Sequence, residues 1–126
     1  MEAKIIGNRH VIAVNNLQKS ADFYKNKLGF RTLWQEGDWH FLTRDAIKIM
    51  LGECPGDKPA SGINCHSYFA YFEVQNIDDL YKEYQTEQVN VLSDIENKPW
   101  GQREFSIRTI DGQRITFGVE ISSEII

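Results

Sequence analysis

Three histidines and two cysteines are the residues best suited to nucleophilic or metal chemistry, and their spacing does not assemble a site. Neither Cys54 nor Cys65 belongs to a Cys-x-x-Cys motif or has a histidine at helical spacing. His66 follows Cys65 directly, and neighbouring side chains on a strand point to opposite faces. The chain has no Gly-rich phosphate loop and no Cys-His or Ser-His pair at an interpretable spacing. These residues therefore indicate no nucleophilic reaction.

The stretch from Lys98 to Gly118 indicates a different chemistry, the stacking of a flat ligand. Pro99-Trp100-Gly101 puts a large aromatic side chain on a tight bend, and an exposed aromatic more often marks an interface than an accident. Asp111-Gly112 predicts a two-residue hairpin turn, because both central residues of the favoured turn need positive φ. We expect a β-hairpin that is entered through an exposed Trp100.

The elements that must position these residues recur in the same order. The expected order is a strand at 11–14, a helix at 17–28 and strands at 30–35, 39–43 and 47–51, then a strand at 66–74, a helix at 77–87 and strands at 89–95, 103–108 and 114–119. Overlaying the halves at an offset of 60 matches Val14 with Val74, Asn16 with Asn76, Leu17 with Ile77 and Tyr24 with Tyr84. Chance similarity of two amphipathic units is the alternative. We interpret the pattern as two βαβββ modules in an α+β fold, each too small to bury its own sheet face.

The size and composition of the chain limit what kind of protein it can be. One domain, 1–126, would contain both modules, about 1–52 and 64–126, joined by a Pro/Gly-rich linker at 53–63. The net charge of −4 argues against a nucleic-acid partner and is compatible with a cationic ligand, although it also fits ordinary solubility. No apolar run approaches a membrane span or a signal peptide. Two cysteines are too few for a disulfide scaffold, so we expect reduced thiols, a cytoplasmic location and no membrane partner.

Several short motifs together resemble one superfamily. The motifs are Val14-Asn-Asn-Leu17, Ser20-Ala-Asp-Phe-Tyr24, Leu28-Gly-Phe30, Val74-Gln-Asn-Ile-Asp-Asp-Leu-Tyr81, Pro99-Trp-Gly101, Arg103-Glu-Phe105 and Asp111-Gly112. In combination they resemble the vicinal oxygen chelate superfamily of glyoxalases, dioxygenases and bleomycin resistance proteins, and the bleomycin-binding branch most. The resemblance implies that the modules form a cupped mixed sheet. Gln102 is one residue more than that branch has, and would shift the start of the strand or form a bulge.

Enzymes of this superfamily hold a divalent metal in the cup at four positions. Here those positions carry Arg9, Met50, Phe69 and Thr116, and none of these suits a hard or borderline ion. His10 adjoins the first position, and a one-residue slip would place it in the cup. That slip would also turn Ile12 and Val14 to the wrong face.

The resemblance instead implies a ligand-binding cup of apolar and aromatic side chains. Its expected lining is Trp34, Trp39, Met50, Phe69, Tyr71, Trp100 and Thr116. Aromatic faces suit a flat, often cationic ligand, and Glu36, Asp38, Glu73 and Glu104 could pair with its amines. Alternatively, Met50 and Phe69 fill a core, and Trp34 or Trp39 serves a dimer contact.

Two functions of different classes follow. The first is a metal-free and cofactor-free homodimeric protein that sequesters a small aromatic, preferably cationic, antibiotic in a cup at the dimer interface and breaks no bond. The alternative is a glyoxalase- or dioxygenase-type enzyme with a degenerate metal site, supported by His10 with Glu104 or Glu120.

Overall fold

The computed structural model describes residues 3, 7–56 and 68–121, with the side chains of Tyr68 and Phe69 left aside. The first half contains β1 (His10–Val14), α1 (Leu17–Asn26), β2 (Arg31–Glu36), β3 (Trp39–Arg44) and β4 (Ile47–Glu53). The second half contains β5 (Tyr68–Glu73), α2 (Ile77–Thr86), β6 (Val91–Asn97), β7 (Gln102–Arg108) and β8 (Arg114–Glu120). The predicted order of two βαβββ modules is confirmed.

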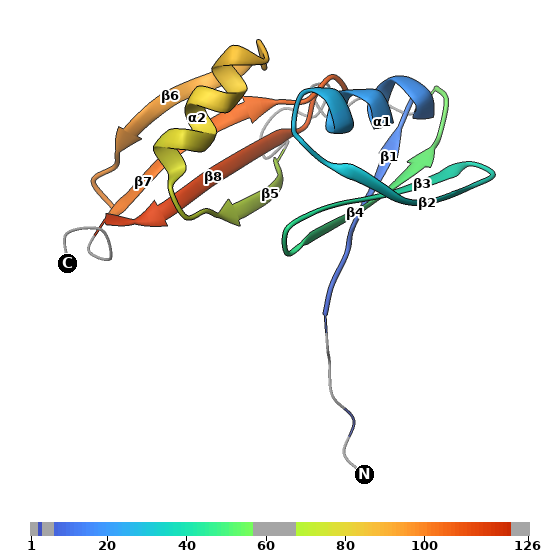
Figure 1. The fold of residues 1–126 in the computed structure, drawn as a ribbon, viewed down its shortest axis with the longest axis horizontal. Helices are drawn as coiled ribbons and strands as arrows, with labels where there is room; N and C mark the ends of the chain where they lie inside the picture. The colour runs from blue at the N-terminus through green and yellow to red at the C-terminus, as the bar shows by residue number, and fades with distance from the viewer. Residues whose placement is uncertain (1–2, 4–6, 57–67, 122–126) are drawn as a thin grey trace.

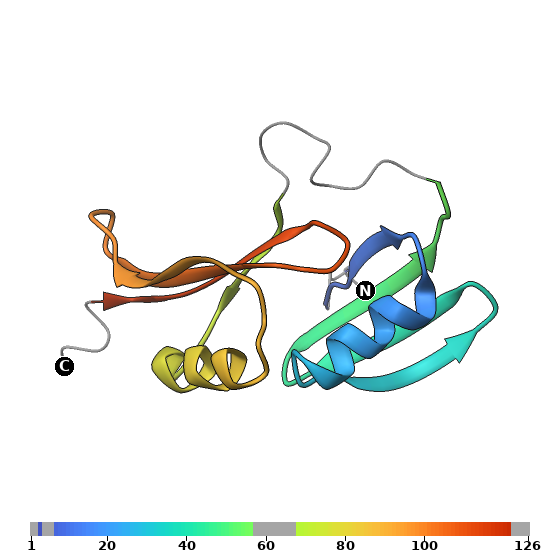
Figure 2. The same cartoon turned by 90° about the horizontal axis from the view of Figure 1, so that it is seen from above.

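Each module is a four-stranded mixed sheet with one helix. The strand orders are β1-β4-β3-β2 and β5-β8-β7-β6, and the first pair in each sheet is parallel while the other pairs are antiparallel. Each helix covers one face of its own module's sheet, α1 in the first module and α2 in the second (Figures 1 and 2). The opposite side of each sheet is therefore free of helices, and we call it the helix-free face.

The two helices begin differently although their sequences repeat. The Asn16 side chain caps α1 by accepting a hydrogen bond from the Lys19 backbone N–H at 3.0 Å. Asn76, its counterpart before α2, has φ +57° and makes no side-chain capping bond. Both helices end earlier than predicted, α1 at Asn26 and α2 at Thr86.

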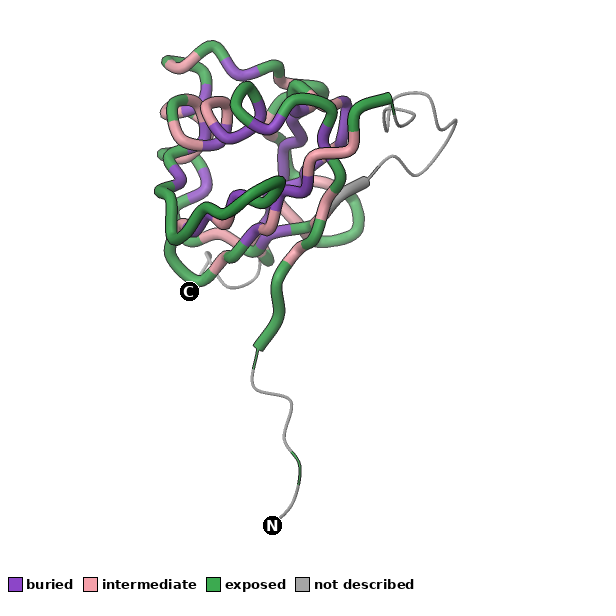
Figure 3. Tube along the Cα trace, turned by 90° about the vertical axis from the view of Figure 1, so that its right-hand side faces the viewer, coloured by how far each residue is buried: buried purple, intermediate pink, exposed green. Residues whose placement is uncertain are grey.

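The core lies between the helices and the sheets, as the buried positions in Figure 3 show. Alternate residues of the central strands, such as Ile49 and Leu51 in β4 and Ile115 and Phe117 in β8, are buried there. The predicted equivalents Tyr24 and Tyr84 are both fully buried. The core is one cluster that both modules share, as expected for modules too small to bury a sheet face alone.

Polar contacts also join the modules. Arg44 of β3 donates to both carboxylate oxygens of Glu83 in α2, at 2.7 and 3.1 Å. The Tyr84 hydroxyl donates to the Leu28 carbonyl at 3.1 Å. These bonds cross from one module to the other and fix how they pack.

The predicted two-residue turn at Asp111-Gly112 is wrong. Gly112 has φ +84°, but Asp111 is not in the positive-φ region, and the Thr109 N–H donates to the Gln113 carbonyl at 2.9 Å to close a longer loop. The loop carries Asp111 to α1, where its carboxylate accepts a 2.8 Å hydrogen bond from the Ser20 hydroxyl. The hairpin therefore closes with a three-residue loop that ends in a left-handed glycine, instead of the predicted two-residue turn.

The boundary between β4 and the predicted linker also moves. Glu53 was expected to begin the linker, but it pairs with Val14 at the end of β4. Its carboxylate accepts a hydrogen bond from the Leu17 N–H at 2.9 Å, so it helps to cap α1. Residues 57–67, which include most of the predicted linker as well as Cys65 and His66, lie outside the described residues.

Candidate functional site

Three aromatic rings gather on the helix-free face of the first module. Trp34 pairs with Phe41 across β2 and β3, and their ring centroids are 4.9 Å apart. The ring centroids of Trp39 and Phe41 are 6.4 Å apart. Trp34 is 50% exposed and Trp39 41% exposed. We call Trp34, Trp39 and Phe41 the aromatic shelf.

The shelf forms because the intervening residues of β3 face the core. His40 and Leu42 are buried, whereas Trp39 is exposed and Phe41 is half-buried, as a period of two requires. Trp39 lies over Gly52 of β4, where an added Cβ would approach its ring to 3.1 Å. Gly52 thus lets the indole lie flat on the sheet.

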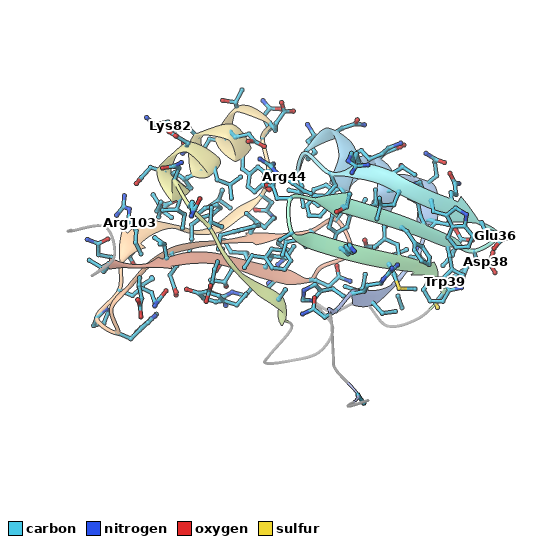
Figure 4. All side chains as sticks on the ribbon, turned by 60° about the horizontal axis from the view of Figure 1, so that its bottom comes forward. Glu36, Asp38, Trp39, Arg44, Lys82 and Arg103 are labelled. Atoms are coloured by element: carbon cyan, nitrogen blue, oxygen red, sulfur yellow. The ribbon has the colours of Figure 1, made fainter. Side chains whose placement is uncertain are left out.

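Charged residues flank the shelf. The Arg9 guanidinium lies 5.7 Å from the Phe41 ring centroid, in the range of a cation–π contact. Glu36 pairs with Trp39 across β2 and β3, and Asp38 lies in the turn between these strands. Figure 4 shows Glu36, Asp38 and Trp39 together at one end of the molecule. Phe41 is thus already covered by a cation, and Trp34 and Trp39 are the rings left near carboxylates.

The helix-free face of the second module is polar. The Tyr71 hydroxyl donates to Glu104 Oε2 at 2.8 Å and lies 3.1 Å from Gln102 Oε1. The hydroxyls of Ser106 and Thr116 are 2.8 Å apart. We call Tyr71, Gln102, Glu104, Ser106 and Thr116 the polar wall.

Burial and a carboxylate shape the chemistry of this wall. Desolvation raises the pKa of Tyr71, and the hydrogen bond to Glu104 and the negative charges of Glu104 and Glu73 raise it further. Glu104 is only 9% exposed. Among the described residues, no lysine or arginine forms an ion pair with Glu104. A cationic group would therefore be favoured beside it.

The register shows that the shelf and the wall occupy equivalent places in the two modules. Val11 pairs with Met50 as Tyr71 pairs with Thr116. In the same way Trp39 pairs with Gly52 as Glu104 pairs with Gly118. Met50 and Thr116 are thus the same position of the repeat.

The residues at the superfamily's metal positions do not fit a metal ion. Arg9 is a cation that lies over Phe41, and Thr116 is buried with its hydroxyl bonded to Ser106. Met50 is half-buried beside Phe41 and offers a soft thioether. The Phe69 side chain lies outside the described residues. No group of three or more His, Cys, Asp or Glu in the described part of the chain could hold a metal.

The two histidines among the described residues, His10 and His40, both pack within the fold. His10, the one metal candidate, packs its ring against Phe72 of the second module at 5.3 Å, on the opposite face to Arg9 and Val11 by strand alternation. His40 is buried, and its Nε2 lies 2.8 Å from the Thr32 hydroxyl. Burial, with the nearby charge of Lys25, lowers the pKa of His40. His10 therefore does not lie on the helix-free face, where the alternative metal-enzyme function would need it as a ligand.

Trp100 is exposed on a three-residue bend, as its motif predicts. The Gly101 N–H donates to the Lys98 carbonyl and the Lys98 N–H donates to the Gln102 carbonyl, while Gly101 has φ +89°. These contacts describe a turn followed by a left-handed glycine, and Trp100 is 64% exposed. Gln102 is the first residue of β7 and pairs with Glu120, so the strand begins one residue before its predicted start at 103.

The structure brings the predicted site residues into three groups. Trp34, Trp39 and Met50 lie together, and so do Tyr71 and Thr116. The bend that carries Trp100 joins β6 to β7, at the opposite end of the molecule from the β2–β3 turn (Figures 1 and 4). Phe41 was missed, although it shares the strand parity of Trp39 and could have been inferred from it.

The fold defines a class: α+β proteins built from two paired βαβββ modules. The model of the Glyoxalase/Bleomycin resistance protein/Dioxygenase superfamily matches residues 8–117. The chain belongs to this superfamily, so the resemblance seen in the sequence is confirmed. Neither helix has the length and apolar character that a membrane crossing requires within the described residues.

Curated relatives and solved structures agree with the assignment. The chain is 26% identical over 127 residues to the bleomycin resistance protein of Geobacillus stearothermophilus, a match that covers 89% of this chain and 95% of that protein. Its fold is similar to that of a glyoxalase/bleomycin resistance protein/dioxygenase from Alicyclobacillus acidocaldarius, with a TM-score of 0.80, 15% identity and coverage of 100% and 99%. The bleomycin-binding protein of Streptomyces verticillus complexed with copper(II)-bleomycin gives a TM-score of 0.73, 21% identity and coverage of 92% and 97%.

Proposed function

We propose that this protein binds a flat aromatic small molecule that carries a cationic group, and that it sequesters the molecule without breaking a bond. The observation that carries this proposal is the aromatic shelf. Its two half-exposed indoles lie on an open sheet face and leave apolar surface for a ring to cover. Stacking on such rings contributes about 1 kcal/mol per pair beyond the burial of apolar area.

The surrounding charges favour a cation over an anion as the ligand's polar group. Glu36 and Asp38 are exposed beside Trp39, and Glu104 is a buried carboxylate on the equivalent face of the second module. A ligand ammonium beside any of these would gain a charge-assisted hydrogen bond. The similarity to bleomycin resistance proteins supports a drug of the bleomycin type as the ligand to test first.

We further propose that the working form is a homodimer. The shelf and Trp100 lie at opposite ends of one chain, so one ligand could meet both only if a second copy supplied one of them. A two-fold dimer that opposes the shelf of one chain to the polar wall and Trp100 of its partner would form two such sites. Sedimentation equilibrium tests this step, since a monomer at micromolar concentration would contradict it.

The experiment for ligand binding is a fluorescence titration. Protein purified with chelator is titrated with metal-free bleomycin while tryptophan emission is recorded. We expect saturable quenching, and about tenfold weaker binding for Trp34→Ala or Trp39→Ala, because a loss near 1.4 kcal/mol is a factor of ten. Leu33→Ala is the matched control, since Leu33 is exposed on the same strand as Trp34.

Two results would contradict the proposal. Equal loss of affinity in Leu33→Ala and Trp34→Ala would show that the shelf is not the binding surface. Zinc, manganese or iron that stays bound at one ion per chain after dialysis would refute the metal-free mode. Trp100→Ala tests the assignment of that residue separately, and unchanged affinity would remove Trp100 from the site.

A further inference from the structure

The helix-free face of the first module carries three cations in one row, on the side of the shelf away from the β2–β3 turn. Thr43 of β3 has the strand parity of Phe41, and it pairs with Arg31 of β2 and with Lys48 of β4. Arg9 comes one residue before β1, at the level of Lys48 in the register of β1 with β4. Because paired residues share a face of the sheet, these cations lie beside the shelf. We call Arg9, Arg31 and Lys48 the basic row.

The charges of the basic row are not neutralised within the described fold. All three side chains are exposed, and within residues 7–56 and 68–121 no carboxylate forms an ion pair with any of them. Arg9 and Lys48 lie on neighbouring strands, where like charges destabilise each other. A bound anion would offset that repulsion, so the row favours an anionic group from outside the chain.

Arg9 connects the basic row to the aromatic shelf. Its guanidinium lies 5.7 Å from the centroid of the Phe41 ring, and Phe41 is the ring that contacts both Trp34 and Trp39. A guanidinium carries five N–H donors in a planar fork that matches the two oxygens of a carboxylate. A carboxylate attached to a ring on the shelf would therefore meet Arg9.

The opposite end of the shelf is acidic. Glu36 pairs with Trp39, and Asp38 lies in the turn that joins their strands (Figure 4). Trp39 of this end and Thr43 of the basic row stand four residues apart on β3, which is roughly 13 Å at the rise of an extended strand. Along this distance the face passes from carboxylates, over exposed rings, to cations.

We propose that the ligand of the shelf is dipolar: a flat ring system with a cationic group at one end and a carboxylate at the other. The ring stacks on Trp34 and Trp39, the cation lies at Glu36 and Asp38, and the carboxylate lies at the basic row. This inference rests on the function proposed above, and it adds a second charged group and an orientation. The reverse orientation is disfavoured because each charge of the ligand would meet its like.

Three biphenyls with the same flat body test the proposal. 4′-(Aminomethyl)biphenyl-4-carboxylic acid carries both charges, its carboxamide carries only the cation, and 4′-methylbiphenyl-4-carboxylic acid carries only the anion. Each is titrated into isotopically labelled protein at low ionic strength while the indole N–H signals of Trp34 and Trp39 are followed, with Trp100 as the reference at the other end of the molecule. We expect the dipolar compound to bind about fivefold more tightly than either of the others, because exposed ion pairs are individually weak. In about 1 M salt this advantage should disappear.

Variants that each remove one charge test the orientation. Lys48→Gln should weaken the dipolar and the anionic compounds about threefold and leave the carboxamide unchanged. Glu36→Gln should weaken the dipolar compound and the carboxamide, and leave the anionic compound unchanged. Lys19→Gln is the matched control, because Lys19 is exposed on α1, which covers the other face of the sheet.

The outcomes separate this inference from the function proposed for the shelf. Equal affinity of wild-type protein for the dipolar compound and its carboxamide, or equal weakening by Lys48→Gln and Lys19→Gln, would overturn the dipolar ligand. Either result would leave the shelf as a site for a cationic ring. If none of the three compounds shifted Trp34 or Trp39, the inference would also be refuted, and the titration of bleomycin would decide the proposed function separately.

Discussion

Gly118→Ala gives the sharpest test of the polar wall. A Cβ at Gly118 would lie 1.8 Å from the Tyr71 hydroxyl and 2.6 Å from Cζ of the same ring. Real Cβ atoms do not approach other atoms so closely, so the phenol must swing off β8. That movement breaks the 2.8 Å hydrogen bond from Tyr71 to Glu104 and leaves a buried carboxylate without this donor.

The expected magnitude combines two opposing effects. A hydrogen bond to a charged group contributes about 1.5–3 kcal/mol, and we take about 1 kcal/mol because Tyr71 is 45% exposed and solvent screens the bond. Alanine in place of glycine restricts the unfolded chain and stabilises the fold by about 0.4–1 kcal/mol. Gly118 has no positive φ, so its backbone accepts alanine without strain. The net effect in the native background is a loss of up to about 0.6 kcal/mol.

The sign should reverse when Tyr71 is removed. In Tyr71→Ala there is no phenol to displace, so adding Gly118→Ala should stabilise the protein by about 0.5 kcal/mol. Urea unfolding of the wild type, the two single variants and the double variant measures this coupling. In Gly118→Ala the pKa of Tyr71 should also fall toward its ordinary range, which ultraviolet titration of the phenol detects. An equal effect of Gly118→Ala in both backgrounds would refute the contact.

Three further predictions concern other features of the fold. Tyr24→Phe should leave the free energy of unfolding unchanged or raise it by about 1 kcal/mol in a thermal melt, because the buried Tyr24 hydroxyl has no hydrogen-bond partner among the described residues. Burial raises the pKa of Asp111 although the Ser20 bond opposes this, so the folded protein takes up the proton first on acidification. The wild type should therefore gain stability relative to Asp111→Asn as the pH falls through this raised pKa, and urea unfolding across the acid range should show no such gain if the shift is absent. Asn16→Ala should cost about 1 kcal/mol of stability, whereas Asn76→Ala removes no capping bond, and equal costs in denaturant would contradict the difference between the two helix starts.

The repeat was predictable because its signal is local. Each module alternates apolar residues along its strands and ends a strand with Val-x-Asn before a helix, so the pairs Asn16 with Asn76 and Tyr24 with Tyr84 could be read from the sequence. The period of a strand or a helix needs no tertiary information. The alternation of side chains along a strand also predicted that Met50 and Tyr71 lie on the helix-free face.

Local composition left the length of the loop at Asp111-Gly112 open. Asp-Gly suits a two-residue turn, but it also suits a three-residue loop in which only the glycine has positive φ, and the structure has the latter. Likewise nothing in the stretch around Trp100 shows that it lies at the other end of the molecule from Trp34, because that separation depends on how the modules pack.

Because the two modules repeat one fold, their helix-free faces can be compared position by position. The positions that hold Trp39, Phe41 and Met50 in the first module hold Glu104, Ser106 and Thr116 in the second. The same backbone therefore presents rings on one sheet and hydrogen-bonding groups with a carboxylate on the other. A glycine lies next to the large side chain in both, Gly52 under Trp39 and Gly118 under Tyr71. Because one repeat yields both surfaces, a ligand with a flat ring and a cationic group matches the pair of faces better than it matches either face alone.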